Sequence, residues 1–417
     1  MAKDDWSPDG TMLPTLEEHT RKKHEVVEQY IHDWVVTLCS NHVGQSSTLT
    51  IIDAFCGGGI YEDPKNESNW LGSPIRFMNS VAKALHFVQT QKGKPGFILD
   101  VHFIFADSNK NHLDCLRKQI KDNNLEHHLI NKTCTLIEGE FLTIFDRLIN
   151  VVETRKGHSF FFIDPYGYTD YSMANIRRIM SIRNSEVLVN YMLDFIQRFL
   201  KKRDQQMQHS LGDLLEAGNY YRDLGKHNHL VRSRQSYLRN ETIRLFREKA
   251  LVKYAYSFGM ITDGQAVKYY LIHLANNPTA QKVIKDALWF HNNIYQYQYE
   301  IFGLSFKVPL EDEELMGNLF NINEDDDAVV QDRLQPKIMD FVAGYERGIS
   351  FRELHTLTMQ ENPASTKHYQ EFLAKMRDYT RDIEILRDGK TTKAKNIQAN
   401  DIIKRSNQKI FNFPKED

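Results

Sequence analysis

The sequence predicts an α/β protein in which a mostly parallel, Rossmann-like sheet is closed by an antiparallel terminal hairpin. Apolar runs of strand length alternate with amphipathic runs of helix length, as they do in β-α-β units. Asp263-Gly264 separates two later apolar runs, 251–260 and 266–274, and Asp-Gly between such runs is a strong hairpin signal. The parallel strands are expected at 49–55, 97–106, 134–137, 160–163 and 187–191.

The segments between these strands have the period of amphipathic helices. The helix after the first strand is expected to begin at Ser73-Pro74, because Ser is a good N-cap and Pro suits the first turn. The other helices are expected at 15–38, 111–122, 141–153, 172–182 and 236–249. Residues 197–235 are polar and interrupt the alternation, so they predict a helical insertion.

The composition changes after the predicted sheet. Residues 311–327 contain eight Asp or Glu residues and no Lys or Arg, which predicts an acidic linker over 311–330. Three short amphipathic stretches and an apolar run follow at 334–347, 350–359, 364–380 and 383–386. Three helices followed by a β-like wing predict a winged-helix-like domain at 331–417, after a Rossmann-like domain at 1–310.

Composition and charge argue against several classes of protein. The 417 residues carry a net charge of −2, so any nucleic-acid surface must be a local patch. The four cysteines lie far apart without C-x-x-C spacing, which favours reduced intracellular thiols over a zinc site. The first 14 residues have no apolar core, and no run approaches the roughly 18 apolar residues of a membrane span. We expect a cytoplasmic protein without a metal site or a membrane anchor.

The first strand leads directly from Asp53 into Phe55-Cys56-Gly57-Gly58-Gly59. Glycines allow a tight turn and let a ligand approach the backbone closely, and this spacing is neither G-x-G-x-x-G nor a P-loop. The acidic strand end two residues before the turn resembles motif I of class I methyltransferases, which bind S-adenosylmethionine. The resemblance implies that Asp53, Phe55, Gly57 and Gly59 hold this cofactor. The alternative is a structural turn without a ligand.

Two further carboxylates follow the next strands of the predicted sheet. Asp107 ends the second strand, where an acid accepts hydrogen bonds from ribose hydroxyls in nucleotide-binding folds. The alternative is a cap for the helix that follows Ser108-Asn109. Glu140 follows the third strand, where methyltransferases often place a residue near the adenine; Glu138 competes for this role, and a solvated loop carboxylate is the alternative.

Asp164-Pro165-Tyr166-Gly167 is the predicted reaction centre. It follows a fully apolar strand, and a carboxylate there is difficult to explain by packing alone. It resembles the Asn/Asp-Pro-Pro-aromatic motif of amino-group methyltransferases, which holds an exocyclic amine and stacks a ring on a flipped base. Tyr166 replaces the second proline of that motif, and Gly167 replaces the aromatic residue. The alternative is a strand that simply ends in a proline turn.

Four blocks in this order resemble the three-Cys-motif partner (TcmP) family, whose members carry a methyltransferase-like domain. The blocks are Glu18–Glu25, Ile52–Tyr61 with Gly72–Pro74, Phe162–Gly167 and Tyr269–Pro278. In this chain, Cys56 replaces the small residue that the family pattern has at the glycine turn. The family name refers to cysteines in a neighbouring protein, so the resemblance implies a separate partner protein.

The first of these blocks contains Thr20, Lys23 and His24. In the family these positions recur ahead of the domain, so the resemblance implies that they cover the cofactor or contact a phosphate. A capped helix start with solvated charges explains them equally well. His24 could act as a general base, although the sequence shows no partner for it.

Basic residues gather in two places and predict nucleic-acid contacts. Lys201, Lys202 and Arg203 lie in the polar insertion, and Lys375 lies on a helix that could enter a groove. The expected wing carries the remaining basic candidates, which could follow a phosphate backbone: Arg387, Lys390, Lys393 and Lys395. A protein-interaction domain with solvated charges is the alternative.

These features leave three functional hypotheses. The first is an S-adenosylmethionine-dependent methyltransferase-like protein that acts on or binds nucleic acid, in a bacterial defence or nucleic-acid modification system. The second is a non-catalytic nucleic-acid-binding or assembly subunit with a separate catalytic partner. The third is a nuclease, for which the sequence shows no D-x-n-E-x-K signature.

Overall fold

The computed structural model describes residues 5–165, 170–192, 212–218, 220–223, 231–262, 266–290, 297–300, 303–307, 334, 338–362 and 364–406. The chain divides into two compact units: Met1–His291 with Ser305–Val308, and Asn292–Leu304 with Pro309–Asp417. Several predicted features lie outside the described residues: Tyr166 and Gly167, the basic cluster Lys201, Lys202 and Arg203, the Asp263-Gly264 turn, and the acidic linker. Because 311–330 is among them, the predicted domain boundaries stay a prediction.

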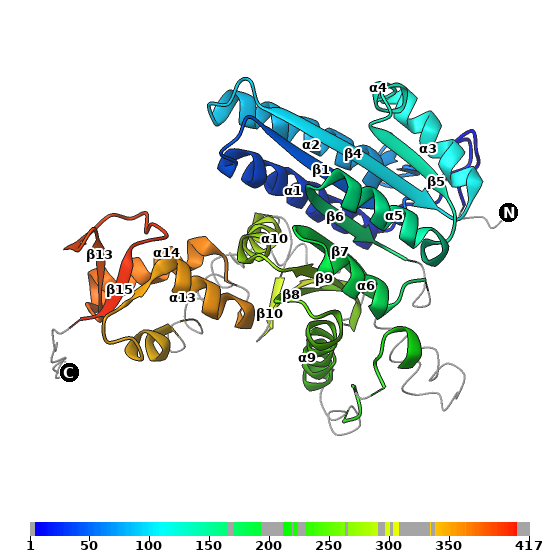
Figure 1. The fold of residues 1–417 in the computed structure, drawn as a ribbon. Coiled ribbons are helices and arrows are strands. Elements are labelled where there is room, and N and C mark those ends of the chain that lie inside the picture. Colours follow the sequence, from blue (N-terminus) through cyan, green and yellow to red (C-terminus); the bar gives the residue numbers. More distant parts are fainter. Residues whose placement is uncertain are drawn as a thin grey trace. The chain divides into compact units, whose positions relative to one another are not determined.

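Seven strands of the first unit form one sheet in the order β5-β4-β1-β6-β7-β9-β8 (Figure 1). The first five of these are parallel to one another, and β9 is antiparallel to both β7 and β8. The strands are β1 (Ser46–Asp53), β4 (Ile98–Asp107), β5 (Cys134–Glu138), β6 (His158–Ile163), β7 (Ser185–Met192), β8 (Tyr254–Thr262) and β9 (Ala266–Ala275). This order confirms the predicted Rossmann-like methyltransferase sheet with its terminal hairpin, although the predicted Asp-Gly turn lies outside the described residues.

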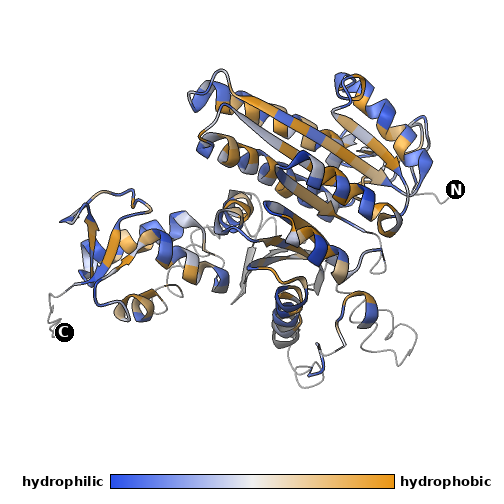
Figure 2. Ribbon diagram, in the orientation of Figure 1, coloured by the Kyte–Doolittle hydropathy of each residue, from blue (hydrophilic) through white to orange (hydrophobic). Residues whose placement is uncertain are grey.

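Helices cover both faces of the sheet (Figure 1). On one face α1 (Glu18–Asn41) packs against α2 (Ser73–Gln91) and α10 (Pro278–Phe290), with α3 (Lys110–Asp122) beside β4 and β5. The other face buries an apolar cluster beneath three further helices, which are α5 (Phe141–Arg155), α6 (Met173–Ser181) and α9 (Val231–Ala250). Figure 2 shows the apolar residues of the central strands between these helix layers. The apolar run 160–163 of β6 is buried on both faces, as expected for a central parallel strand.

Several short elements complete the first unit. β2 (Ile60–Tyr61) and β3 (Trp70–Leu71) pair antiparallel directly after the glycine turn, and α4 (His127–Ile130) precedes β5. β11 (Gly303–Lys307) runs parallel to β8. No helix among the described residues is long and apolar enough to cross a bilayer.

The second unit contains helices and a small antiparallel sheet in the order β12-β15-β13-β14. Helical residues 338–343 precede it, and Ser350 caps α13 by accepting a hydrogen bond from the Glu353 N–H at 3.2 Å. Its elements are β10 (Tyr297–Glu300), β12 (Ile349–Ser350), α13 (Phe351–Thr358), η3 (Met359–Glu361), α14 (Thr366–Lys375), η4 (Met376–Thr380), β13 (Ile383–Arg387), β14 (Lys390–Thr391) and β15 (Ile402–Arg405). That this unit is a winged helix stays a prediction.

Candidate functional site

Three of the predicted carboxylates meet at the carboxyl edge of the sheet. Asp53 is the last residue of β1, Asp107 is the last residue of β4, and Asp164 follows β6. The strands are parallel, so their carboxyl ends lie at one edge, which is where open α/β sheets bind ligands. Burial raises the pKa of Asp53 to about 7, and the charges of Asp164 and Asp107 add to this effect.

Asp53 supports the turn from inside the protein. Its side chain is fully buried and accepts hydrogen bonds from the Ser73 hydroxyl at 2.7 Å and the Phe55 N–H at 3.3 Å. Both donors belong to segments that follow β1 in the chain. This geometry matches a carboxylate that orients the turn.

A cavity of about 460 Å³ opens at this edge of the sheet, and Asp53 is not among the described residues that line it. Three predicted cofactor residues, Phe55, Asp107 and Glu140, are among the described residues that line it, and Glu138 is not. The other described lining residues are Ala54, Ser108, His112, Gly139, Phe141, Leu142 and Asp170. A volume of this size suits a nucleoside-sized ligand. His112 and Asp170 were not predicted from the sequence, although His112 lies only five positions after Asp107.

Asp107 is held by three hydrogen bonds from the protein. Its carboxylate accepts from the Gly57 N–H at 3.0 Å and the Asn109 N–H at 2.8 Å, and it contacts His112 Nδ1 at 3.0 Å. The other ring nitrogen of His112 contacts the Asp5 carboxylate. Burial lowers the pKa of His112, but the hydrogen bonds and charges of Asp107 and Asp5 outweigh burial and raise it.

The glycine turn is covered by an aromatic side chain that was not predicted from the sequence. An added Cβ would lie 2.2 Å from the Trp6 indole at Gly58 and 2.8 Å from it at Gly57. Gly57 and Gly59 also have φ of +58° and +76°, which side chains disfavour. Trp6, rather than a ligand, therefore makes the close approach at Gly57 and Gly58. The contacts with Trp6 therefore explain why glycine is needed at positions 57 and 58, without a cofactor.

Asp164 lies in a polar cluster on the β6–β7 side of the edge. Its two oxygens are bound by Lys23 Nζ at 2.5 Å and by Asn190 Nδ2 at 2.6 Å, and Pro165 beside it is buried. The side chains of Lys23 and Asp164 are 8% and 16% exposed, so this is a largely buried ion pair. Lys23 also lies 5.7 Å from the centre of the Tyr269 ring.

Asn190, which was not predicted, leaves one buried acceptor in this cluster. Asn190 is 5% exposed, and its Oδ1 has no hydrogen-bond partner among the described residues. The orientation of the amide is fixed by Asp164, because the opposite orientation would place Oδ1 against a carboxylate oxygen. The sequence could have indicated Asn190, because it is a polar residue near the end of an apolar strand.

His24 and Thr20 lie with Lys23 on α1. His24 is 3% exposed and accepts a hydrogen bond from the Trp70 indole at 3.1 Å. Burial lowers the pKa of His24 well below its usual value, and the charges of Lys23 and Arg76 lower it further. His24 is therefore neutral near pH 7, and Thr20 is only half-buried.

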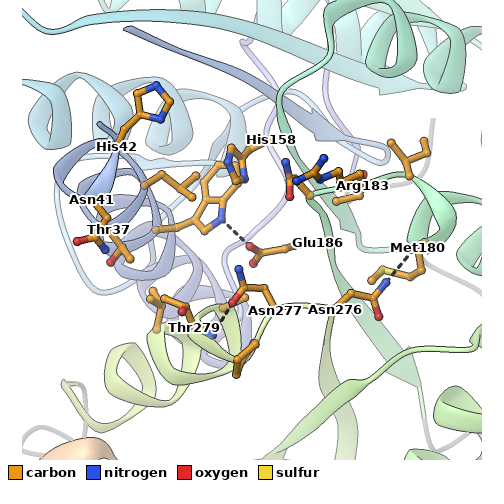
Figure 3. A pocket seen from close by; sticks show the side chains of 18 of the residues that line it. Thr37, Asn41, His42, His158, Met180, Arg183, Glu186, Asn276, Asn277 and Thr279 are labelled. Atoms are coloured by element: carbon orange, nitrogen blue, oxygen red, sulfur yellow. Dashed lines mark hydrogen bonds between the residues drawn. The ribbon is translucent and has the colours of Figure 1, made fainter. Parts of the chain in front are cut away.

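A larger cavity of about 680 Å³ lies at the opposite edge, among the amino ends of β6 and β7 (Figure 3). Glu186 lines it and is already bound by Trp34 Nε1 at 2.8 Å, by His273 Nε2 at 3.2 Å and by the Tyr30 hydroxyl. Asn276 and Asn277 are occupied by bonds to nearby backbone groups. Since this edge is not where open α/β sheets bind ligands, the cavity beside Asp107 is the better candidate.

The predicted basic residues of the second unit divide into two groups. Lys375, Lys390, Lys393 and Lys395 are exposed. Arg387 instead makes a bidentate ion pair with Asp401 at 2.9 and 2.8 Å, so it holds β13 to the segment before β15. Among the described residues, no group of three His, Cys, Asp or Glu side chains could hold a metal ion.

Comparisons with known proteins add only weak likenesses. No family model and no curated protein matches the sequence, so the three-Cys-motif partner resemblance stays a prediction. Similar solved structures include protein LPL1258 from Legionella pneumophila, at 11% identity over 64% of this chain and 91% of that chain, with a TM-score of 0.37. The methyltransferase domain of bacterial CtHen1-C has 11% identity over 60% and 98% of the two chains and a TM-score of 0.27. An O-methyltransferase from Bacillus cereus in complex with SAH has 11% identity over 62% and 92%, and a TM-score of 0.29.

Proposed function

We propose that this protein binds S-adenosylmethionine at the carboxyl edge of its sheet and methylates an amino nitrogen of a nucleic acid. The observation that carries the proposal is the cavity of about 460 Å³ between the ends of β1, β4 and β5, which Asp107 and Glu140 line. Carboxylates at these strand ends suit the hydroxyl and amino donors of a nucleoside. A nucleic-acid modification or bacterial defence system is the proposed setting.

The described residues fit the nucleoside half of the cofactor. A carboxylate has about four acceptor sites, and Asp107 uses three of them within the protein, which leaves one for a ribose hydroxyl. Glu140 is exposed at the start of α5 and can accept from an adenine amine. The Phe55 and Phe141 rings, 5.8 Å apart, provide an apolar wall for the base.

The methyl acceptor is proposed to lie beside Asp164. Bound S-adenosylmethionine supplies an electrophilic methyl group on a sulfonium, so the residues of the protein mainly orient the acceptor. Asn190 Oδ1 is a buried acceptor atom without a partner among the described residues, and an amine N–H would satisfy it. The Lys23 ammonium holds the Asp164 carboxylate in place.

The proposed nucleic-acid contact rests on the exposed lysines of the second unit. Lys390, Lys393 and Lys395 lie on β14 and in the loop that follows it, and Lys375 ends α14. Lysines in such a row can neutralise successive phosphates and release their counterions.

Transfer of a labelled methyl group tests the proposed function. Purified protein would be incubated with S-adenosylmethionine carrying a tritiated methyl group and with RNA or DNA from cells, and the nucleosides would be separated after digestion. We expect label in an N-methylated nucleoside with the wild-type protein and a loss of at least about tenfold with Asn190→Ala. Lys83→Ala, which removes an exposed lysine of α2, is the control. Label in neither nucleic acid with the wild-type protein would contradict methyl transfer.

A non-catalytic subunit is the second candidate, and two contacts favour it. Trp6 covers Gly57 and Gly58, and both oxygens of Asp164 are occupied by the protein's own side chains. The sheet would then be a scaffold that binds nucleic acid and a separate catalytic partner protein. Nucleic-acid binding without any methyl transfer in the labelling experiment would select this function.

A further inference from the structure

The N-terminal residues 5–12 form a loop that is closed on itself. The Ser7 N–H donates to the Met12 carbonyl at 3.1 Å, and the Met12 N–H donates to the Ser7 hydroxyl at 2.9 Å. Asp9 sits inside the loop and accepts from the Ser7 hydroxyl at 2.7 Å and from the Thr11 N–H at 3.1 Å. Because these bonds lie within the loop, they hold whether or not the loop contacts the glycine turn.

Trp6 attaches this loop to the glycine turn. Its indole N–H donates to the Ile60 carbonyl at 2.5 Å, and the side chain is 2% exposed. The edge of the ring packs against Tyr61 and His112, with centroids 5.2 and 4.8 Å away. The indole therefore fills the space directly next to the backbone of the turn.

A second attachment runs from the loop to the cavity. Asp5 contacts His112, and the other nitrogen of His112 contacts Asp107. The position of the loop is thus coupled to the carboxylate that would hold the ribose. Beyond the loop, the chain is fastened independently, because the Glu62 N–H donates to the Pro14 carbonyl at 3.0 Å and the Leu16 N–H donates to the Glu62 carbonyl at 2.8 Å.

We infer that residues 5–12 are a gate over the glycine-turn half of the cofactor site, an inference that rests on the proposed function. A nucleoside needs only the cavity beside Asp107, which the gate leaves open. A ligand with an amino-acid chain that continues along the glycine turn meets the Trp6 indole. The gate must therefore open for the whole cofactor, with the fixed segment at Pro14 as its pivot. The apparent affinity for the longer ligand is then reduced by the fraction of molecules whose gate is open.

Calorimetry with two probes of different length tests the gate. Adenosine and S-adenosylhomocysteine would be titrated into the full-length wild-type protein, Trp6→Ala and the control Met12→Ala, whose side chain is exposed on the same loop. We expect Trp6→Ala to bind S-adenosylhomocysteine at least about tenfold more tightly than the wild type. This is the gain expected if the gate of the wild type is open in about a tenth of the molecules or fewer. Adenosine affinity should stay within about twofold, and Met12→Ala should change neither affinity.

Three results would overturn the gate. These are an unchanged affinity of Trp6→Ala for S-adenosylhomocysteine, a weaker affinity, or an equal gain for adenosine. Binding of neither probe to the wild type or to Trp6→Ala would instead contradict the proposed cofactor site and remove the gate with it. If Trp6→Ala does not fold, Asp5→Asn serves in its place, because it weakens the contact to His112 while the amide oxygen can still accept from the Trp6 backbone N–H. It should tighten S-adenosylhomocysteine binding and leave adenosine binding unchanged, and no tightening would reject the gate.

Discussion

The two sides of the carboxyl edge use similar carboxylates in different ways. On the β4–β5 side, Asp107 and Glu140 line a cavity of about 460 Å³. On the β6–β7 side, Asp164 is neutralised by Lys23 and bound by Asn190. The difference comes from α1, which brings a lysine only to the second side. A strand-end carboxylate therefore faces a cavity or is neutralised by an internal cation, depending on which distant element covers it.

Removing Lys23 should have the largest effect on stability. Lys23→Met leaves Asp164 charged and largely buried without a cation, which typically costs about 3–5 kcal/mol. We expect this loss in the free energy of unfolding, measured with urea. Adding Asp164→Asn should restore part of it, because no unpaired charge remains. Lys65→Met is the control, since Lys65 pairs with Glu18 at the surface and such pairs contribute at most about 1 kcal/mol. Equal losses for both lysine variants would contradict the difference between the two sides.

Asp53 should make stability depend on pH. Its pKa is raised by burial from 3.8 to about 7, so the folded state binds this proton more tightly than the unfolded state does. The resulting stabilisation is complete below about pH 4 and is lost as pH rises through 7. The loss is about 1.4 kcal/mol for each pH unit between the unfolded and folded pKa values, or about 4 kcal/mol at most. Asp53→Asn lacks this loss. Unfolding free energies of both proteins from pH 4 to 8 should therefore diverge, and parallel curves would rule out a raised pKa.

Gly58→Ala should destabilise the protein only when Trp6 is present. The added Cβ would lie 2.2 Å from the indole, and overpacking of this kind costs about 1–3 kcal/mol. In a Trp6→Ala background the cost should disappear, which a double-mutant cycle by thermal unfolding would measure. Gly96→Ala is a matched control, because a Cβ there meets nothing within 4 Å. A cost that persists without Trp6 would place another group on the turn.

Replacing the exposed lysines of the second unit should have the smallest effect on the free energy of unfolding. It should instead weaken the binding of nucleic acid. The triple variant Lys390→Ala, Lys393→Ala and Lys395→Ala should bind duplex nucleic acid more weakly, by fluorescence anisotropy. The slope of log affinity against log salt should fall by about 0.9 for each phosphate that the variant no longer neutralises. The control replaces three exposed lysines of the first unit, Lys92, Lys118 and Lys121. Identical slopes for all three proteins would remove the predicted nucleic-acid surface.

The sequence predicted the sheet well because its signals are local. Runs such as Phe160–Ile163 identify buried strands, and the acids at their ends follow directly, so Asp53 and Asp107 could be assigned in advance. The role of Trp6 could not be predicted from the sequence. Trp6 lies about 50 residues before the turn that it covers, in a polar segment with no periodic pattern.

The pairing of Lys23 with Asp164 spans 141 residues, and the contact of Asp5 with His112 spans 107. Neither pairing has a local signal. The same holds for Asn190, whose role depends on a neighbour in another strand. The sequence thus predicted which carboxylates reach the edge of the sheet, but the side chains that occupy them became visible only in the fold.

Binding of S-adenosylmethionine tests the central claim most directly. Equilibrium dialysis with the labelled cofactor would compare the wild type with Asp107→Ala, and with Asp122→Ala, which changes an exposed carboxylate at the end of α3. Thermal unfolding would check that each variant folds. We predict saturable binding to the wild type and to Asp122→Ala, and an affinity at least about tenfold weaker for Asp107→Ala. No binding to the wild type, or equal binding to Asp107→Ala, would contradict a cofactor site in this cavity.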